Sequence, residues 1–272
     1  MPTGQKRRLG YHPVNALKLL IIKRFMPIET NALFLFLLIL PFISFLYASV
    51  GHGGASGYLA LMALFGFPNE MMKQTALLLN LFVAGISFYH YYRAGHFNKH
   101  LFIPFAIGSV PAAFLGGTLS LEPLIYKKIL GVLLLIAVMR MLWKGSGDSR
   151  PIKRVKTIQA LLFGLAVGFF SGLIGIGGGI ILTPLILLLR WGHMKEAAAV
   201  SALFIWVNSA AGLLGQFSTG ITLVPISGVM VVIAVFGGIV GSYLGSRKWK
   251  TQFLEYFLAF VLTTASIKLL LF

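Results

Sequence analysis

The chain has 272 residues, of which 58% are hydrophobic and only 11% are charged. Soluble domains carry about 25% charged residues, so this composition excludes an ordinary soluble domain and predicts an integral membrane protein. The absence of cysteine excludes disulfides, thiolate metal sites and cysteine nucleophiles. The six acidic residues are scattered singly, which leaves little material for a paired-carboxylate active site.

Basic residues outnumber acidic ones by 23 to 6, and they gather outside the apolar segments. One group lies in an N-terminal tail, residues 1–28, and another in a linker, residues 144–157. Basic loops beside apolar spans are topology signals and sit favourably against anionic lipid headgroups. We therefore expect membrane lipids as partners and no nucleic acid. Within the tail, residues 14–26 are predicted to form an interfacial helix.

Ten apolar segments follow along the chain, and we predict that all of them are α-helices of a polytopic membrane protein. They cover residues 31–50, 54–66, 73–92, 101–119, 124–143, 158–174, 176–190, 197–217, 224–246 and 253–272. A membrane span needs about 20 residues. Segments 54–66 and 176–190 fall short, and each follows a glycine cluster. We expect these two to be half-helices inside the membrane.

The second half of the chain resembles the first. Gly51-His-Gly-Gly-Ala55 aligns with Gly175-Ile-Gly-Gly-Gly179 at an offset of 124, and further matches follow in the same order. This pattern predicts two homologous transmembrane repeats, residues 29–143 and 158–272.

Basic loops set the predicted orientation of these repeats. Suppose that each glycine break belongs to a hairpin that enters and leaves the membrane on the same side. Most of the basic loop residues then lie on one side of the membrane, and the positive-inside rule predicts that this side is cytoplasmic. The basic tail disagrees, because this arrangement places it outside. Each repeat then crosses an odd number of times, so the repeats are inverted, as in many secondary transporters. We expect a multi-pass protein of a bacterial inner (plasma) membrane.

Small residues recur at every fourth position in three of the long segments. One row is Gly164, Gly168 and Gly172, and another is Gly237, Gly241 and Gly245. Such rows line one helix face and allow backbones to approach closely. They predict tight helix packing, and they would also suit a homodimer interface.

The two glycine clusters are the candidate binding site. A helix that begins inside the membrane presents unpaired N–H groups and the positive end of its dipole, which together suit an anion. Glycine has no Cβ to hold the backbone away from a guest. The candidates are Gly51, His52, Gly53 and Gly54 in the first cluster and Gly175, Gly177, Gly178 and Gly179 in the second. The alternative is that these glycines only permit close helix crossing.

Polar residues on the helices after the breaks are further candidates. They are Thr75, Asn80, Ser201, Asn208 and Ser209. Polar groups in lipid-bounded helices must find partners, so these residues either line the substrate cavity or join helices. His52 could donate to an anion, carry a coupling proton or be purely structural. The second cluster has Ile176 at the matching position.

Sequence motifs for catalysis are missing. The chain has no P-loop, no Gly-x-Ser-x-Gly elbow and no His-Glu-x-x-His pattern. We therefore predict no enzymatic activity, no cofactor and no metal. Energised transport would draw on an ion gradient, with a proton or sodium as coupling ion, or on a partner.

The second cluster resembles the TauE/SafE family of membrane permeases. It continues as Ile180-Ile-Leu-Thr-Pro184 and is followed by Lys195-Glu-Ala-x-x-x-Ser201 and Asn208-Ser-Ala-Ala-Gly212. The first cluster departs from the pattern, with Ala55 in place of the last glycine. The resemblance implies a secondary transporter of a small sulfur-containing anion such as sulfite, sulfoacetate or another sulfonate. The alternatives are a passive anion channel and a non-transporting membrane scaffold.

Overall fold

The computed structural model describes residues 30–142, 151–247 and 252–271. Throughout these residues the regular structure is helical, with ten helices and no strand, which confirms the all-helical fold. Six helices are long and apolar enough to cross a membrane. The predicted interfacial helix over 14–26 and the first half of the predicted linker, residues 144–150, lie outside the described residues.

The helices follow one another through short connections. In chain order they are α2 (Thr30–Ser49), α3 (Ala55–Leu64), α4 (Asn69–Arg93), α5 (Lys99–Thr118), α6 (Pro123–Leu142), α7 (Thr157–Ile174), α8 (Gly179–Leu188), α9 (Met194–Ser218), α10 (Ile226–Arg247) and α11 (Gln252–Leu271). The six candidate spans lie in α2, α4, α5, α7, α9 and α10.

Two helices are short, as the sequence predicts. Helices α3 and α8 have 10 residues each. At 1.5 Å per residue each is about 15 Å long, roughly half the hydrocarbon thickness of a bilayer. Both begin directly after a glycine in the left-handed conformation, Gly54 with φ 100° and Gly178 with φ 76°. The two half-helices therefore start within the bundle.

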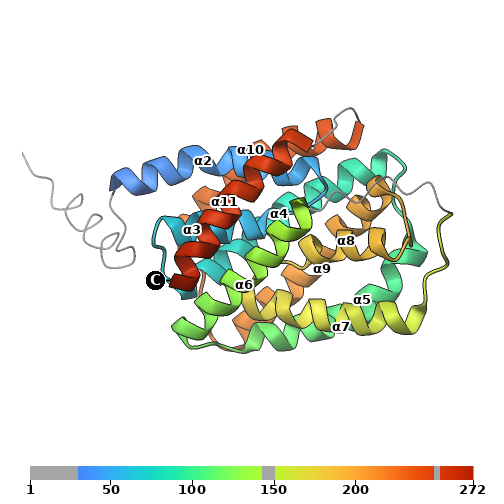
Figure 1. Cartoon of the computed structure of the whole chain (residues 1–272). Helices are drawn as coiled ribbons and strands as arrows, with labels where there is room; N and C mark the ends of the chain where they lie inside the picture. The colour runs from blue at the N-terminus through green and yellow to red at the C-terminus, as the bar shows by residue number, and fades with distance from the viewer. Residues whose placement is uncertain (1–29, 143–150, 248–251, 272) are drawn as a thin grey trace, which may run out of the picture.

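Glycine rows hold the long edges of the bundle together. Helix α5 packs along α7, and α2 packs along α10 (Figure 1). The glycines that face a backbone carbonyl of the partner helix are Gly164, Gly168 and Gly172 on α7 and Gly237, Gly241 and Gly245 on α10. A Cβ at Gly241 would lie 2.8 Å from the carbonyl carbon of Phe45 on α2. The predicted close packing of these rows is confirmed.

Helices α4 and α9 pack on each other between the two edges. Each also carries a short helix, since α3 packs on α4 and α8 packs on α9 (Figure 1). Helix α11 packs on α6 and α3. The glycine breaks, which precede α3 and α8, are thereby brought against the central pair.

The two halves of the chain contain helices in the same order of lengths, with the short helix second in each. Each long edge of the bundle is formed by one helix from each half: α5 of the first half packs on α7 of the second, and α2 of the first half packs on α10 of the second. These contacts join the halves into one bundle. The homology of the repeats, their inversion and the domain limits at 29–143 and 158–272 stay predictions.

We predict that Gly241→Ala lowers the melting temperature of the purified protein in detergent by several degrees. The added methyl group collides with the backbone of α2, and overpacking of this kind costs about 1–3 kcal/mol. The matched control is Gly228→Ala on the same helix, where a Cβ meets nothing within 4 Å. Equal melting of the two variants would contradict the carbonyl contact.

Candidate functional site

The two breaks are built from glycines in the left-handed conformation. In the first break Gly51 has φ 76°, and in the second Gly175 and Gly177 have φ 90° and 77°. Residues with a Cβ rarely adopt this conformation. The chain can therefore leave one helix and start the next within a few residues only because glycine occupies these positions.

The breaks leave backbone donors without backbone partners. Within the described residues, no main-chain carbonyl accepts from the N–H groups of Gly53–Gly57 or of Gly177–Ile180. Almost all of these residues are buried. Buried N–H groups in proteins are nearly always paired, and here they gather at the positive ends of α3 and α8. They are the donors that an anion would use.

The Asn80 side chain lies between the two breaks. A Cβ at Gly53 would lie 2.5 Å from Asn80 Oδ1, and one at Gly177 would meet Asn80 Nδ2. Ile205 on α9 faces the same two glycines, since both Cβ positions lie 2.9 Å from its Cγ2. The two breaks therefore converge on Asn80 from one half of the chain and Ile205 from the other.

The Asn80 amide has no hydrogen-bond partner within the described residues, at either Oδ1 or Nδ2. The residue is 0% exposed. A buried polar group left unsatisfied costs about 1–3 kcal/mol, and such groups are rare in folded proteins. An amide that is buried, unpaired and flanked by free backbone donors is the strongest candidate for a ligand contact among the predicted residues.

His52 joins the first break to the second half. Its Nδ1 lies 3.2 Å from the Val50 carbonyl oxygen, and its Nε2 lies 3.1 Å from the Gly179 carbonyl oxygen. Nε2 is also 3.3 Å from Thr183 Oγ1, and the Thr183 hydroxyl donates to Ser201 Oγ at 2.8 Å. The predicted residues His52, Gly179 and Ser201 therefore belong to one polar chain.

The outer glycines have a packing role. A Cβ at Gly51 would lie 2.6 Å from Ala198 Cβ on α9, and one at Gly175 would lie 3.0 Å from the Lys73 carbonyl oxygen on α4. Close crossing thus explains these two positions, whereas Gly53 and Gly177 face Asn80.

Three further predicted residues lie elsewhere on α4 and α9. Thr75, Asn208 and Ser209 are each 0% exposed and each carries a side-chain oxygen without a partner in the described part of the chain. Asn208 Nδ2 donates to the Phe204 carbonyl within its own helix. Among the residues that the structure describes, no hydrogen bond joins these three side chains to either break.

Three residues at the breaks were not predicted from the sequence. Ile205 is apolar and so gave no sign of a polar site. Thr183 lies within the conspicuous second cluster, and its hydroxyl was the available signal. Lys73 donates to the Gly117 and Leu119 carbonyls at 3.2 and 2.9 Å, so it caps the last turn of α5.

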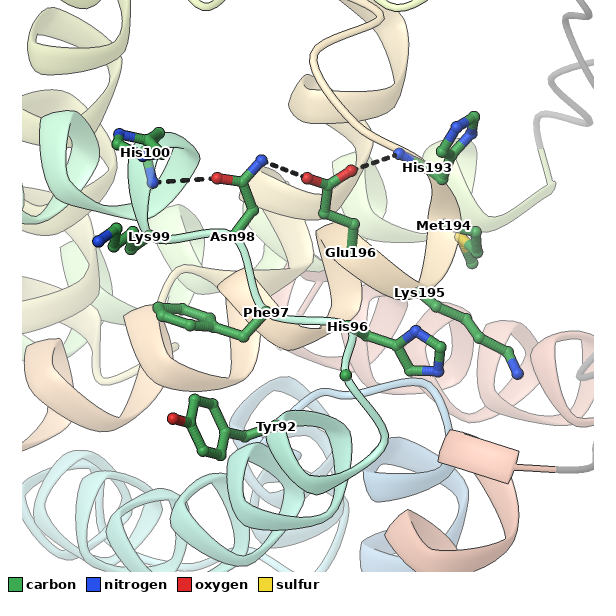
Figure 2. Close-up of a pocket in the computed structure, with 11 residues that line it drawn as sticks. Tyr92, His96, Phe97, Asn98, Lys99, His100, His193, Met194, Lys195 and Glu196 are labelled. Carbon is green, nitrogen blue, oxygen red and sulfur yellow. Dashed lines mark hydrogen bonds between the residues drawn. The ribbon is translucent and has the colours of Figure 1, made fainter.

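A basic pocket opens at the connection between α4 and α5 and the start of α9 (Figure 2). It has a volume of about 1050 Å³ and is lined by Tyr92, Gly95, His96, Phe97, Asn98, Lys99, His100, His193, Met194, Lys195 and Glu196. This pocket lies on the side predicted to be cytoplasmic. Its surplus of basic groups would draw anions from solution.

A hydrogen-bonded link between the two halves crosses this pocket. Asn98 Nδ2 donates to Glu196 Oε1 at 2.5 Å, while Asn98 Oδ1 accepts from the His100 backbone N–H at 3.0 Å (Figure 2). The other Glu196 oxygen accepts from the His193 backbone N–H at 3.3 Å. The link therefore caps α5 and α9 together. In the part of the chain that the structure describes, no group of three side chains could hold a metal ion.

An all-helical bundle with six candidate spans and two half-helices that begin in its interior defines a multi-pass membrane transporter. The chain belongs to the sulfite exporter TauE/SafE family, whose model matches residues 35–269. An inner-membrane location is consistent with its bacterial relatives.

Related proteins are described as probable membrane transporters. The probable membrane transporter protein y4hK of Sinorhizobium fredii is 35% identical over 232 residues, covering 84% of this chain and 94% of the relative. The probable membrane transporter protein MJ0441 of Methanocaldococcus jannaschii is 25% identical over 263 residues, covering 88% and 98%. No solved structure matches the chain.

We predict that Asn98→Asp destabilises the protein at neutral pH by about 1 kcal/mol, because it places two carboxylates together while keeping the acceptor that caps α5. Thermal melts at neutral pH measure this. Adding Glu196→Gln should restore stability at neutral pH, and a melt insensitive to both changes would contradict the link.

Proposed function

We propose that this transporter moves a small sulfur-containing anion, such as sulfite, sulfoacetate or another sulfonate, and that the anion binds between the two glycine breaks. The observation that carries the proposal is the buried, unpartnered Asn80 amide beside Gly53 and Gly177. The family description, sulfite exporter, supports the sulfur-containing class.

The chemistry of the breaks favours an anion over a cation. The groups that converge there are N–H donors and the N-terminal ends of α3 and α8, which carry partial positive charge. Neither half-helix contains an acidic residue. A sulfite or sulfonate group offers three acceptor oxygens, so it can accept from both breaks and from Asn80 Nδ2 at once.

Space at the breaks favours a small head group. A single Cβ at Gly53 or Gly179 would collide with Asn80 or Ile205. The Asn80 and Ile205 side chains thus already lie against the backbone of these glycines, so only a small head group could enter by displacing them. The basic pocket near Lys99 and Lys195 adds a positive mouth that favours the same class of ligand.

Purified protein should be tested by thermal shift against sulfite, sulfoacetate, sulfate, chloride and acetate. A ligand that binds only the folded state raises stability by mass action, by about 2.7 kcal/mol at a hundred times its Kd. Selective stabilisation by sulfite or sulfoacetate supports the proposal. Absence of any shift at millimolar concentration would count against the anion site.

Two other functions give different results in reconstituted vesicles. A passive anion channel would carry flux that follows the anion gradient alone, whereas a secondary transporter accumulates anion when a proton or sodium gradient is imposed. A scaffold, whose glycines serve only packing, would carry no flux.

We predict that Asn80→Leu leaves the melting temperature unchanged or higher, because it removes a buried amide that has no partner. Uptake of the anion should nevertheless fall about tenfold or more, since a lost hydrogen bond to a charged group is worth about 1.5–3 kcal/mol. Uptake into vesicles measures this.

The matched control for this substitution is Ser87→Ala, two turns further along α4. Ser87 is buried and its Oγ is also unpartnered in the described residues, so the control removes a similar polar atom outside the breaks. Equal uptake by both variants and the unmodified protein would show that Asn80 does not contact substrate.

A further inference from the structure

The His52 ring is held between acceptors. Nδ1 faces the Val50 carbonyl oxygen at 3.2 Å, and Nε2 faces the Gly179 carbonyl oxygen at 3.1 Å. The third neighbour of the ring is Thr183 Oγ1, 3.3 Å from Nε2, whose own hydrogen is directed to Ser201. In this geometry both ring nitrogens have an oxygen lone pair in front of them.

A neutral imidazole can donate to only one of these two carbonyl oxygens. It carries one N–H, so one nitrogen lone pair must face a carbonyl oxygen, and a carbonyl can only accept. The imidazolium ion carries two N–H groups and satisfies both carbonyls. Histidine is the side chain whose charge changes most readily near neutral pH.

The place of the ring determines what would stabilise its charge. His52 lies in the first break and contacts Gly179, the first residue of α8, so an imidazolium ion would stand beside the partly positive ends of two half-helices. Positive charge alone is unfavourable there. An anion between the breaks would neutralise it, and an imidazolium ion would in turn attract the anion.

We propose that His52 is the coupling-proton site of the transporter, and that one proton binds Nδ1 or Nε2 together with one anion. The proposal rests on the anion site proposed above. Because coupling between two ligands is reciprocal, protonation strengthens anion binding by the factor by which the anion strengthens protonation. Ile176 in the second break cannot titrate, so the pair of breaks takes up one proton.

The other titratable and charged groups nearby have roles of their own. Those on the flanking elements include Tyr47, Tyr58, Lys73, Tyr89, His90, Tyr91, Tyr92, Arg93, Lys195, Glu196, Tyr243 and Arg247. Glu196 is engaged by Asn98 and the His193 N–H, and Lys195 Nζ donates to the Ser246 carbonyl. The Tyr58 hydroxyl donates to Ser44, and that of Tyr91 donates to the Ser49 carbonyl.

Proton uptake on anion binding tests the proposal. Purified protein in weak buffer is titrated with sulfoacetate, whose two acidic groups stay ionised between about pH 6 and pH 8, and a pH-indicator dye reports protons taken up. The unmodified protein should take up close to one proton per anion bound. His52→Gln should bind sulfoacetate, as judged by thermal shift, but take up none.

Transport measurements in vesicles test the same role of His52. An imposed proton gradient should drive sulfoacetate accumulation by the unmodified protein in vesicles, whereas His52→Gln should retain exchange of labelled for unlabelled sulfoacetate and lose gradient-driven accumulation. The control is His90→Gln, which replaces a half-buried ring on α4 that lies outside both breaks and the basic pocket, with its Nδ1 2.7 Å from Ser242 Oγ. This variant should behave as the unmodified protein does.

The two proposals fail in different ways. If the unmodified protein is not stabilised by sulfoacetate or sulfite, the anion site itself is wrong. If the unmodified protein binds the anion without taking up a proton, only the assignment of His52 is wrong. This measurement uses the unmodified protein, so it does not depend on the folding of a variant. Proton uptake that persists in a folded His52→Gln variant would also overturn the assignment.

Discussion

Backbone N–H and C=O groups inside a membrane need hydrogen-bond partners or cover from other parts of the protein. At the two glycine breaks this chain leaves backbone N–H groups without backbone partners. A spanning helix satisfies its own N–H and C=O groups. At Gly53–Gly57 and Gly177–Ile180 the N–H groups have no backbone acceptor in the described residues. The rest of the bundle shields them: α4 and α9 lie against the breaks, and the glycine-lined edges close around that central pair. The tight helix packing thus allows backbone N–H groups without backbone partners to exist inside the bundle.

The surroundings of the breaks are alike in shape and unlike in polarity. Gly53 and Gly177 both face Asn80 and Ile205, so the two breaks share the same pair of neighbours. The polar member of that pair comes from the first half, as do His52 and Lys73. The second half contributes the fuller glycine run, Thr183 and Ser201. A ligand between the breaks would meet backbone donors on both sides and most of the side-chain chemistry on one.

The two halves meet in two ways, through side-chain hydrogen bonds at helix termini and through packed helix edges. His52 reaches Gly179, and Asn98 reaches Glu196 at the basic pocket. Both are hydrogen bonds at helix termini, because Gly179 begins α8, Asn98 caps α5 and Glu196 lies in the first turn of α9. The helix edges, by contrast, meet through rows of backbone contacts such as those of Gly237 and Gly245. If transport occurs by rocking of rigid groups of helices, the packed helix edges would be preserved and the hydrogen bonds at the helix termini would break.

The sequence alone determined the membrane class, the helical fold and the positions of the two half-helices, because each depends on local composition and on glycine. It also identified the glycines of both breaks and the buried polar residues Asn80 and Asn208. The sequence could not separate Gly51, which packs on Ala198, from Gly53, which faces Asn80, since both are simply glycines in one cluster. Nor could it select Ile205 or Thr183. Those distinctions depend on which side chains from distant helices meet at a break, and only the packing of α4, α8 and α9 decides that.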